Sequence, residues 1–159
     1  MSAPAAAPIL VFDASPLLAW VLQAQDQWRR VQRLLASRAE GVMPASALTE
    51  TIYVARKRGN TASPAQIHAA LVAQGLRVEP ITEDDAEWAG GVISESQANP
   101  ARWTTVRGEQ REGTLSLGDG LTLAVAHRLG ARAVTFDAAW SRFPTLTFPL
   151  VDPWRVPNS

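Results

Sequence analysis

The stretch that decides the fold is LSLGDGLTLAVAHRLGARAVTFDAAW, residues 115–140. Its first part predicts a helix over about residues 118–129, with Asp119 in the first turn, where a carboxylate suits the positive end of the helix dipole. Residues 132–136 follow as a short strand pattern that ends at Asp137. A helix that opens on one acid and a strand that ends on another indicate one unit of an α/β fold.

The N-terminal region contains a second strand pattern that ends on an acid. Residues 9–12, ILVF, form a continuous apolar run, as expected for a strand buried on both faces of a parallel sheet. The run ends at Asp13, and Ser15 with Pro16 supplies an N-cap and a proline at the first helical position. Sites in parallel sheets form outside the carboxyl ends of the strands, so Asp13 and Asp137 are candidate site residues. An aspartate that merely caps the turn after a strand is the alternative for each.

Helical and extended patterns alternate along the rest of the chain. Further helices are predicted over residues 15–22, 26–38, 46–58, 63–74, 82–97 and 138–143, and further strands over residues 41–44, 76–81 and 145–151. Residues 98–116 show no periodicity, and we expect them to form an unusually long loop. The alternation predicts a three-layer α/β/α sandwich around a mostly parallel central sheet.

Length and composition fit one globular domain. The chain has 159 residues, of which 47% are hydrophobic and 19% charged, and this excludes a disordered protein. We assign residues 1–7 to a flexible N-terminal arm, 8–152 to a single domain and 153–159 to a C-terminal tail. No segment resembles a signal peptide or a membrane-spanning helix, so we expect no membrane association. The lack of cysteine excludes disulfides, thiolate metal sites and cysteine nucleophiles, and it suits a cytoplasmic location.

The charge balance limits how the chain could bind nucleic acid. Lys and Arg number 15 and Asp and Glu number 15, so binding would need a local basic patch. In the unpatterned stretch, Arg102, Arg107 and Arg111 could contact RNA phosphates and Trp103 could stack on a base, although arginines in a solvated loop are unremarkable. The run RKR at residues 56–58 ends a predicted helix, where cations suit the dipole, but it could also steer a phosphate.

The helical position of Glu50 allows two interpretations. Within the predicted helix 46–58 it lies nearly opposite the apolar face, which is typical of a solvated side chain. Tyr53 and Val54 flank it, however, so that side of the helix is not purely polar. A glutamate that faces a cleft therefore remains open as the second interpretation.

Carboxylates from four separate elements, Asp13, Glu50, Asp119 and Asp137, describe a site made of hard oxygen ligands. With no cysteine and only two histidines in the chain, such a set favours Mg²⁺ or Mn²⁺ over zinc or copper. Clustered acids repel one another unless a cation lies among them. A bound cation of this kind can activate a water and stabilise the in-line displacement at a phosphodiester.

Other phosphate chemistries each lack a required residue. A response-regulator receiver needs a lysine after a late strand, and the only lysine, Lys57, lies in a predicted helix. A haloacid-dehalogenase-like phosphatase needs a second aspartate two residues after the first, where this chain has Ser15. The GDG sequence at residues 118–120 lacks the lysine and the spacing of a phosphate-binding loop.

Three blocks of the chain together resemble the PIN domain, and within it the VapC-type ribonuclease toxins of bacterial toxin–antitoxin pairs. They are ILVFDASPLLAW at residues 9–20, MPASALTETIYVARKRG at residues 43–59, and the stretch at residues 115–140. The resemblance extends over about residues 8–151. This chain departs from the usual family pattern at Gly120, where an alanine generally follows the third acid.

The resemblance implies a metal-dependent endoribonuclease that acts as the toxin of a type II toxin–antitoxin pair. Its acidic quartet maps onto the four candidate carboxylates, with Mg²⁺ or Mn²⁺ as cofactor. Thr135 and Ser15 would be hydroxyls that orient these ligands. The resemblance also implies an RNA substrate, a homodimer and a cognate antitoxin that covers the cleft. A non-catalytic PIN-like module that binds RNA or protein is the alternative function.

Overall fold

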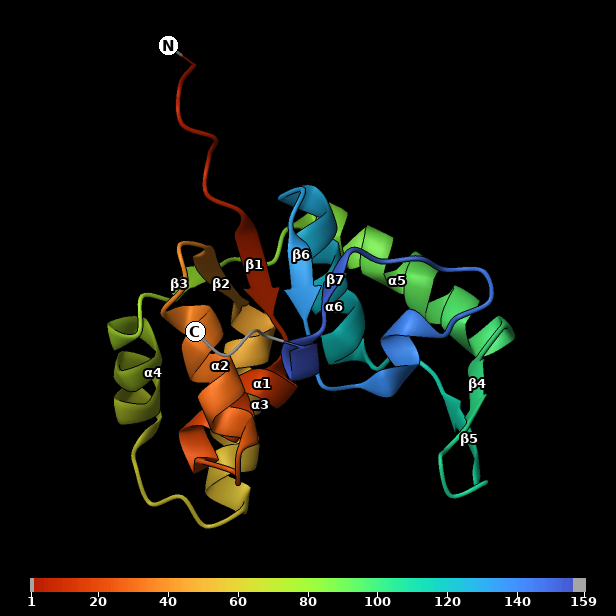
Figure 1. Cartoon of the computed structure of the whole chain (residues 1–159), viewed down its shortest axis with the longest axis horizontal. Coiled ribbons are helices and arrows are strands. Elements are labelled where there is room, and N and C mark those ends of the chain that lie inside the picture. Colours follow the sequence, from red (N-terminus) through yellow and green to blue (C-terminus); the bar gives the residue numbers. More distant parts are fainter. Residues whose placement is uncertain (1, 156–159) are drawn as a thin grey trace.

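A parallel sheet forms the centre of the computed structural model, which describes residues 2–155 (Figure 1). Its strand order is β3–β2–β1–β6–β7, and every neighbouring pair is parallel. The strands are β1 (Ile9–Phe12), β2 (Glu40–Pro44), β3 (Arg77–Glu79), β6 (Arg132–Val134) and β7 (Leu150–Val151). In the centre of the sheet Val11 lies opposite Val42 on one side and Ala133 on the other.

Helices cover both faces of this sheet. They are α1 (Ala14–Leu22), α2 (Gln27–Leu35), α3 (Ala45–Lys57), α4 (Pro64–Ala73), α5 (Glu83–Ala98) and α6 (Leu117–Arg128), with short 3₁₀ helices η1 (Ala138–Ser141) and η2 (Pro153–Arg155). Leu10 and Phe12 of β1 belong to a core cluster with residues of α1 to α4, whereas Val11 belongs to a second cluster with residues of α6. This alternation confirms the predicted three-layer sandwich.

The direction of the crossovers explains which helices lie on which face. From β1 to β3 the chain steps toward one edge of the sheet, and it then returns past β1 to form β6. Right-handed crossovers that run in opposite directions place their helices on opposite faces. The helices before β3 therefore lie on one face, and α5 with α6 on the other.

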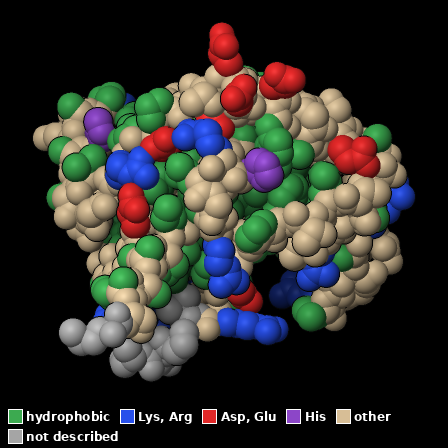
Figure 2. All heavy atoms as spheres, turned by 90° about the horizontal axis from the view of Figure 1, so that it is seen from above, with side chains coloured by type: hydrophobic (Ala, Val, Ile, Leu, Met, Phe, Trp, Pro, Cys, Tyr) green, Lys and Arg blue, Asp and Glu red, His purple; other side chains and the backbone are tan. Residues whose placement is uncertain are grey.

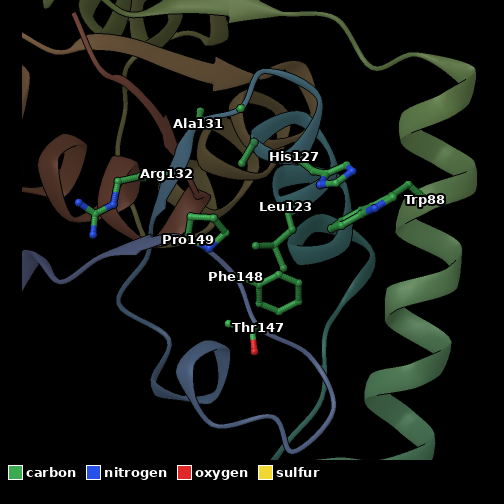
Figure 3. Close-up of a pocket in the computed structure, with 10 residues that line it drawn as sticks. Trp88, Leu123, His127, Ala131, Arg132, Thr147, Phe148 and Pro149 are labelled. Carbon is green, nitrogen blue, oxygen red and sulfur yellow. The ribbon is translucent and has the colours of Figure 1, made fainter.

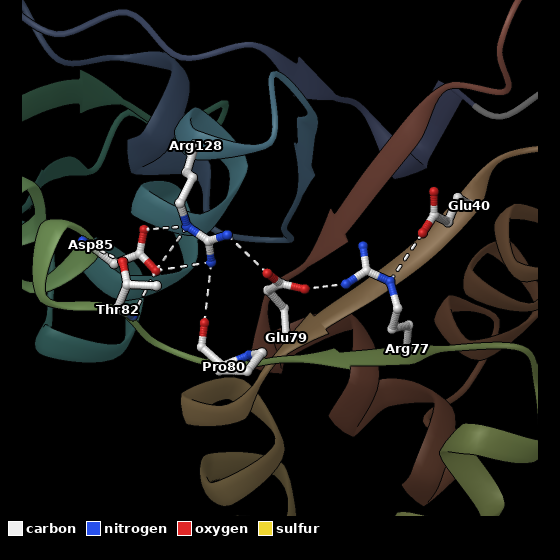
Figure 4. A network of polar contacts seen from close by, with 7 residues as sticks. All are labelled: Glu40, Arg77, Glu79, Pro80, Thr82, Asp85 and Arg128. Atoms are coloured by element: carbon white, nitrogen blue, oxygen red, sulfur yellow. Dashed lines mark hydrogen bonds and ion pairs between the residues drawn. The ribbon is translucent and has the colours of Figure 1, made fainter.

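An ion-pair network fixes the last turn of α6 (Figure 4). The Arg128 guanidinium donates from Nε to Asp85 Oδ1 at 3.0 Å, from Nη2 to Asp85 Oδ2 at 3.0 Å and from Nη1 to Glu79 Oε1 at 2.8 Å. Glu79 also pairs with Arg77, which reaches Glu40 on β2. Burial acts to raise the pKa of Asp85, but the hydrogen bonds from Arg128 and Thr82, together with the charge of Arg128, outweigh it and lower that pKa. The network ties the last turn of α6 to α5 and β3.

The prediction of a long loop at residues 98–116 is wrong, because this segment contains an antiparallel hairpin. Its strands are β4 (Ala101–Thr104) and β5 (Gln110–Gly113), and Gly108 takes the positive φ of 79° in the turn. Most side chains of the hairpin are polar or charged, so it lacks the alternation of apolar and polar residues that marks a half-buried strand.

Three of the predicted strands are shorter than expected, and one of them is β6, which covers Arg132–Val134 of the predicted residues 132–136. The strand predicted over residues 76–81 covers Arg77–Glu79, because Pro80 has no N–H to donate to the ladder. Only Leu150–Val151 of the strand predicted over residues 145–151 pairs with the sheet. Its neighbour β6 has three residues, so there is little edge for a longer strand to bond.

One face of the molecule shows the mixture of charges expected from the even charge balance. Figure 2 views the side at which β1 and β6 begin, where Lys and Arg side chains lie among acidic and apolar ones.

Part of the assigned C-terminal tail forms η2, and residues 156–159 lie outside the described residues, as does residue 1 of the arm. No helix in the described part of the chain has the length and apolar character to cross a membrane.

Candidate functional site

The candidate site lies where the strand order reverses. β1 has β2 on one side and β6, which follows much later in the chain, on the other. Ligands of open α/β sheets bind in the crevice outside the carboxyl ends of the strands at such a point. Asp13 directly follows β1, and its backbone N–H donates to the carbonyl of Val134 on β6 at 2.9 Å. The two strands therefore end side by side at this edge.

All four predicted acids line one pocket at this edge, with a volume of about 250 Å³. Its described lining residues are Asp13, Ala14, Ser15, Leu18, Glu50, Thr51, Val54, Arg58, Asp119 and Asp137. The acids come from four different parts of the fold: the end of β1, the middle of α3, the first turn of α6 and the segment after β6. The structure thus brings together the four acidic side chains that were predicted from the sequence as candidate site residues.

Two hydroxyl groups hold the carboxylate of Asp13. Its Oδ2 accepts hydrogen bonds from Thr135 Oγ1 at 2.9 Å and from Ser15 Oγ at 3.1 Å. Ser15 Oγ in turn accepts from the N–H of Phe136 at 3.1 Å, and Thr135 Oγ1 accepts from the N–H of Asp137 at 3.1 Å. Both predicted hydroxyl residues therefore orient Asp13 and join the end of β1 to the segment after β6.

Asp13 is the most buried acid of the pocket, with 5% of its surface exposed. Burial, with the nearby negative charge of Asp119 as a smaller contribution, raises the pKa of Asp13 from 3.8 to about 7. The hydrogen bonds from Thr135, Ala14 and Ser15 oppose this shift but do not cancel it. Without a cation, a large fraction of Asp13 is therefore protonated at neutral pH.

Asp119 is held by the N-terminal cap of α6. Its Oδ2 accepts from the N–H of Ser116 at 2.8 Å, and its own N–H donates to Ser116 Oγ at 3.2 Å, which forms a capping box. Burial raises the pKa of Asp119, and the charges of Asp137 and Glu50 add to this, while the Ser116 hydrogen bonds act against it. The pKa shifts of Asp13 and Asp119 thus come first from burial, and the charges of neighbouring acids add to them.

Two glycines at the start of α6 make room for neighbouring side chains. A Cβ at Gly118 would lie 2.8 Å from Glu50 Oε2, so the glycine lets this carboxylate approach α6. A Cβ at Gly120 would lie 2.5 Å from Ile93 Cδ1, so the glycine allows close packing of α6 on α5. The departure from the usual alanine is thus explained by the position of Ile93.

Glu50 and Asp137 are the exposed acids of the pocket. The buried residues of α3 are Ala47, Thr51 and Ala55, and Glu50 lies beside this buried face at the pocket. The interpretation of a glutamate that faces a cleft therefore fits the structure better than that of a fully solvated one. Asp137 Oδ1 accepts from the N–H of Ala139 at 2.8 Å and caps η1, so the turn-capping alternative and the site position both apply to it.

The donor set of the pocket suits a divalent cation with a preference for oxygen. Carboxylates alone supply its acidic and metal-binding groups, and a cation bound beside them would favour the charged form of the buried Asp13. Within residues 2–155, no three Asp, Glu or His side chains already stand in the arrangement of a metal cage. Metal binding by these acids therefore stays a prediction and requires some side-chain rotation.

The sequence did not lead to Arg58 being predicted, apart from Arg56 and Lys57, as a residue of the pocket. Arg58 lines the pocket eight residues after Glu50, with Val54 between them, and these residues form one stripe of α3. The i, i+4, i+8 spacing was present in the sequence. It could be recognised only once the side of α3 that faces the pocket was known.

The predicted RNA-binding residues of the hairpin are not brought to the acidic pocket. Arg102 pairs with Glu112 at 3.0 Å, and Arg111 pairs with Glu109 at 2.6 Å, both on exposed surface. Trp103 is half-buried and packs against the core, with the Arg142 guanidinium 5.6 Å from its ring centre. Contacts of RNA with Arg102, Trp103, Arg107 and Arg111 stay a prediction.

A second pocket, of about 240 Å³, lies between α5, α6 and the segment before β7 (Figure 3). Trp88 of α5 stacks on His127 of α6 there, with ring centroids 4.8 Å apart and an interplanar angle of 16°. Phe148 meets Trp88 edge to face at 6.5 Å. The described lining residues are mostly apolar and include no carboxylate, so this pocket lacks the chemistry of the first.

Comparison with known proteins gives one family and a set of similar folds. The family model described as PIN domain matches residues 10–146. The structure of the sarcin-ricin-loop-cleaving toxin VapC20 of Mycobacterium tuberculosis has 21% sequence identity and a TM-score of 0.63, over 81% of this chain and 90% of that chain. VapBC2 of Rickettsia felis, solved with a DNA fragment from its promoter, has 16% identity and a TM-score of 0.63, over 91% and 99%. FitAcB of Neisseria gonorrhoeae has 16% identity and a TM-score of 0.61, over 92% and 99%. No curated protein sequence matches this chain.

Proposed function

Because this chain belongs to the PIN domain family, we propose that it is a metal-dependent endoribonuclease and the toxin of a type II toxin–antitoxin pair. One observation carries the proposal: Asp13, Glu50, Asp119 and Asp137, from four separate elements, line a single pocket at the switch point of the sheet. A non-catalytic binding module would have no need for four carboxylates at this edge.

The four acids would hold Mg²⁺ or Mn²⁺. A divalent cation bound there would stabilise negative charge on the phosphodiester and lower the pKa of a water. In the proposed hydrolysis, the water oxygen bonds to phosphorus and the P–O bond to the leaving ribose oxygen breaks. The water loses a proton, and the leaving oxygen gains one.

The other residues of the pocket keep the acids ready for this role. Ser15 and Thr135 both donate to Oδ2 of Asp13, so neither hydroxyl occupies Oδ1 of that carboxylate. Ser116 similarly uses Oδ2 of Asp119 and leaves Oδ1. Hydrogen bonds to one oxygen of each carboxylate thus set its orientation before any ligand binds.

We also propose that a cognate antitoxin covers the pocket and that the chain forms a homodimer in the cytoplasm. The proposal is supported by the folds that this chain resembles, since one of them is a toxin-antitoxin complex from Klebsiella pneumoniae, with 17% sequence identity and a TM-score of 0.60. Co-expression with the reading frame directly upstream of its gene, followed by size-exclusion chromatography with light scattering, tests both associations. A monomer with no bound partner would reject them.

The test of the activity is cleavage of RNA by the purified protein. We expect cleavage with Mg²⁺ or Mn²⁺, no cleavage in excess chelator, and loss of cleavage in Asp137→Asn. Glu87→Gln on α5, an exposed acid outside the pocket, is the matched control and should cleave as wild type does. Full cleavage in chelator, or an active Asp137→Asn protein, would reject the mechanism. RNA binding without cleavage under every condition would favour the non-catalytic module.

A further inference from the structure

One arginine side chain, that of Arg58, lies on the wall of the acidic pocket. Glu50, Val54 and Arg58 of the α3 stripe all line it, and Arg58 is the C-cap residue of that helix. Eight residues of helix correspond to about 12 Å along the axis. Glu50 and Arg58 therefore mark opposite ends of this stripe along the pocket wall.

The fold makes no use of the Arg58 side chain. Across residues 2–155 its guanidinium has no ion pair and no hydrogen bond. The two preceding cations differ, because Arg56 donates to the carbonyl of Ala62 and the Lys57 amino group lies 5.8 Å from the centre of the Tyr53 ring. Arg56 and Lys57 also line a separate hollow elsewhere on α3. Only Arg58 of this basic run lines the acidic pocket.

The charge of the pocket explains why a cation would be needed there. Four carboxylates repel a polyanionic strand, and a divalent cation neutralises only part of their charge. A guanidinium presents a planar fork of donors that matches two oxygens of a phosphate. A cation at the end of the pocket can thus hold a strand whose neighbouring phosphate lies at the acids.

We propose that Arg58 binds a backbone phosphate of the RNA that flanks the phosphate being cut. This inference rests on the proposed function, since it takes the acids as the place of cleavage. Arg58 is then a substrate-binding residue, and the basic run at residues 56–58 divides into one residue for RNA and two that contact the fold.

The test compares Arg58→Gln, Arg58→Lys and the matched control Arg56→Gln in the full chain. Binding of a single-stranded RNA oligonucleotide is measured by fluorescence anisotropy at several salt concentrations, with Ca²⁺ as the cation. Arg58→Gln should weaken binding about 10- to 100-fold and reduce the slope of log K against log salt by about 0.7. Arg58→Lys should keep the slope and recover part of the affinity. Arg56→Gln should change neither, and the Mn²⁺-induced melting shift should be equal in all the proteins.

A second measurement locates the phosphate. In an RNA whose cleavage position has been mapped, single phosphates are replaced by neutral methylphosphonates. One replacement next to the cut should reproduce the loss seen with Arg58→Gln, and it should cause no further loss in that variant. If the loss of affinity from Arg58→Gln and the loss from each methylphosphonate were independent at every position, the assignment of Arg58 to one phosphate would be overturned.

The outcomes separate this inference from the proposed function. Equal binding and equal salt slopes in Arg58→Gln and wild type overturn the inference, while metal-dependent cleavage by both would leave the nuclease intact. Wild-type binding without cleavage, lost in Arg58→Gln, supports the role of Arg58 and rejects the nuclease. A wild-type protein that neither binds nor cuts RNA overturns both.

Discussion

Replacing Asp13 by asparagine should stabilise the metal-free protein at neutral and alkaline pH. Burial raises the pKa of Asp13 from 3.8 to about 7, so between these values the folded state binds a proton that the unfolded state has lost. Stability therefore falls as pH rises through this range. Each pKa unit is worth about 1.4 kcal/mol, so Asp13 lowers the free energy of unfolding by about 4 kcal/mol between pH 4 and pH 7 or above. Asparagine has no charge to desolvate, and its carbonyl can still accept from Ser15 and Thr135.

The assay is urea unfolding of both proteins at pH 4 to 8 in excess chelator. Asp13→Asn should exceed wild type by about 2–4 kcal/mol at pH 8, and the difference should shrink toward pH 4. The difference between the proteins isolates Asp13, because the other titrating groups are common to both. Glu87→Gln should run parallel to wild type. Parallel curves for wild type and Asp13→Asn would refute the assignment of a buried, proton-binding carboxylate.

Three further predictions concern α6 and its two ends. Urea unfolding at pH 7 should show that Arg128→Gln destabilises the fold by about 2–4 kcal/mol, because Asp85, 2% exposed, loses its charged partner. Since the pKa of Asp85 is lowered in the folded state, this loss of stability should diminish as the pH falls below about 4. An equal loss at pH 3 would contradict the ion pair. Gly120→Ala should destabilise the fold by about 1–3 kcal/mol, because its Cβ would lie 2.5 Å from Ile93 Cδ1. In an Ile93→Ala background the same substitution should stabilise the fold, because only helix propensity then decides. A stability change of the same sign in both backgrounds would contradict the steric reasoning. Mn²⁺ at a hundredfold excess over its Kd should raise the melting temperature by about 5–10 °C, and Asp119→Asn should reduce this shift in differential scanning fluorimetry; an undiminished shift would place the metal elsewhere.

The parts of the fold that follow from local patterns could be predicted from the sequence. The apolar run before Asp13 and the strand before Asp137 each mark a buried parallel strand, and parallel strands place their ends at one edge. Two of the carboxylates that gather there, Asp13 and Asp137, are therefore visible in the sequence as residues that follow strands. The hairpin at residues 101–113 was not visible, because charged pairs rather than alternating apolar residues cover it.

The parts of the site that depend on the packing of one helix on another could not be predicted. Whether Glu50 faces water or a cleft depends on how α3 packs against α1 and α6, and its helical position alone allowed both. The same is true of Arg58, whose position in the pocket separates it from the two cations before it. The use of Gly120 likewise depends on where Ile93 of a different helix lies.

The hydroxyl contacts at Asp13 have a consequence for when the pocket can form during synthesis. Asp13 and Thr135 lie 122 residues apart in sequence, and Ser15 and Thr135 lie 120 apart. Contacts of such long sequence separation close late in folding, and a nascent chain folds from its N-terminus as it is made. β1, β2 and β3 can assemble with α1 to α4 while the ribosome still holds the segment that supplies Asp119, β6 and Asp137. A partly synthesised chain therefore has no acidic pocket, and we expect any cleavage activity to begin only after the chain has left the ribosome that made it.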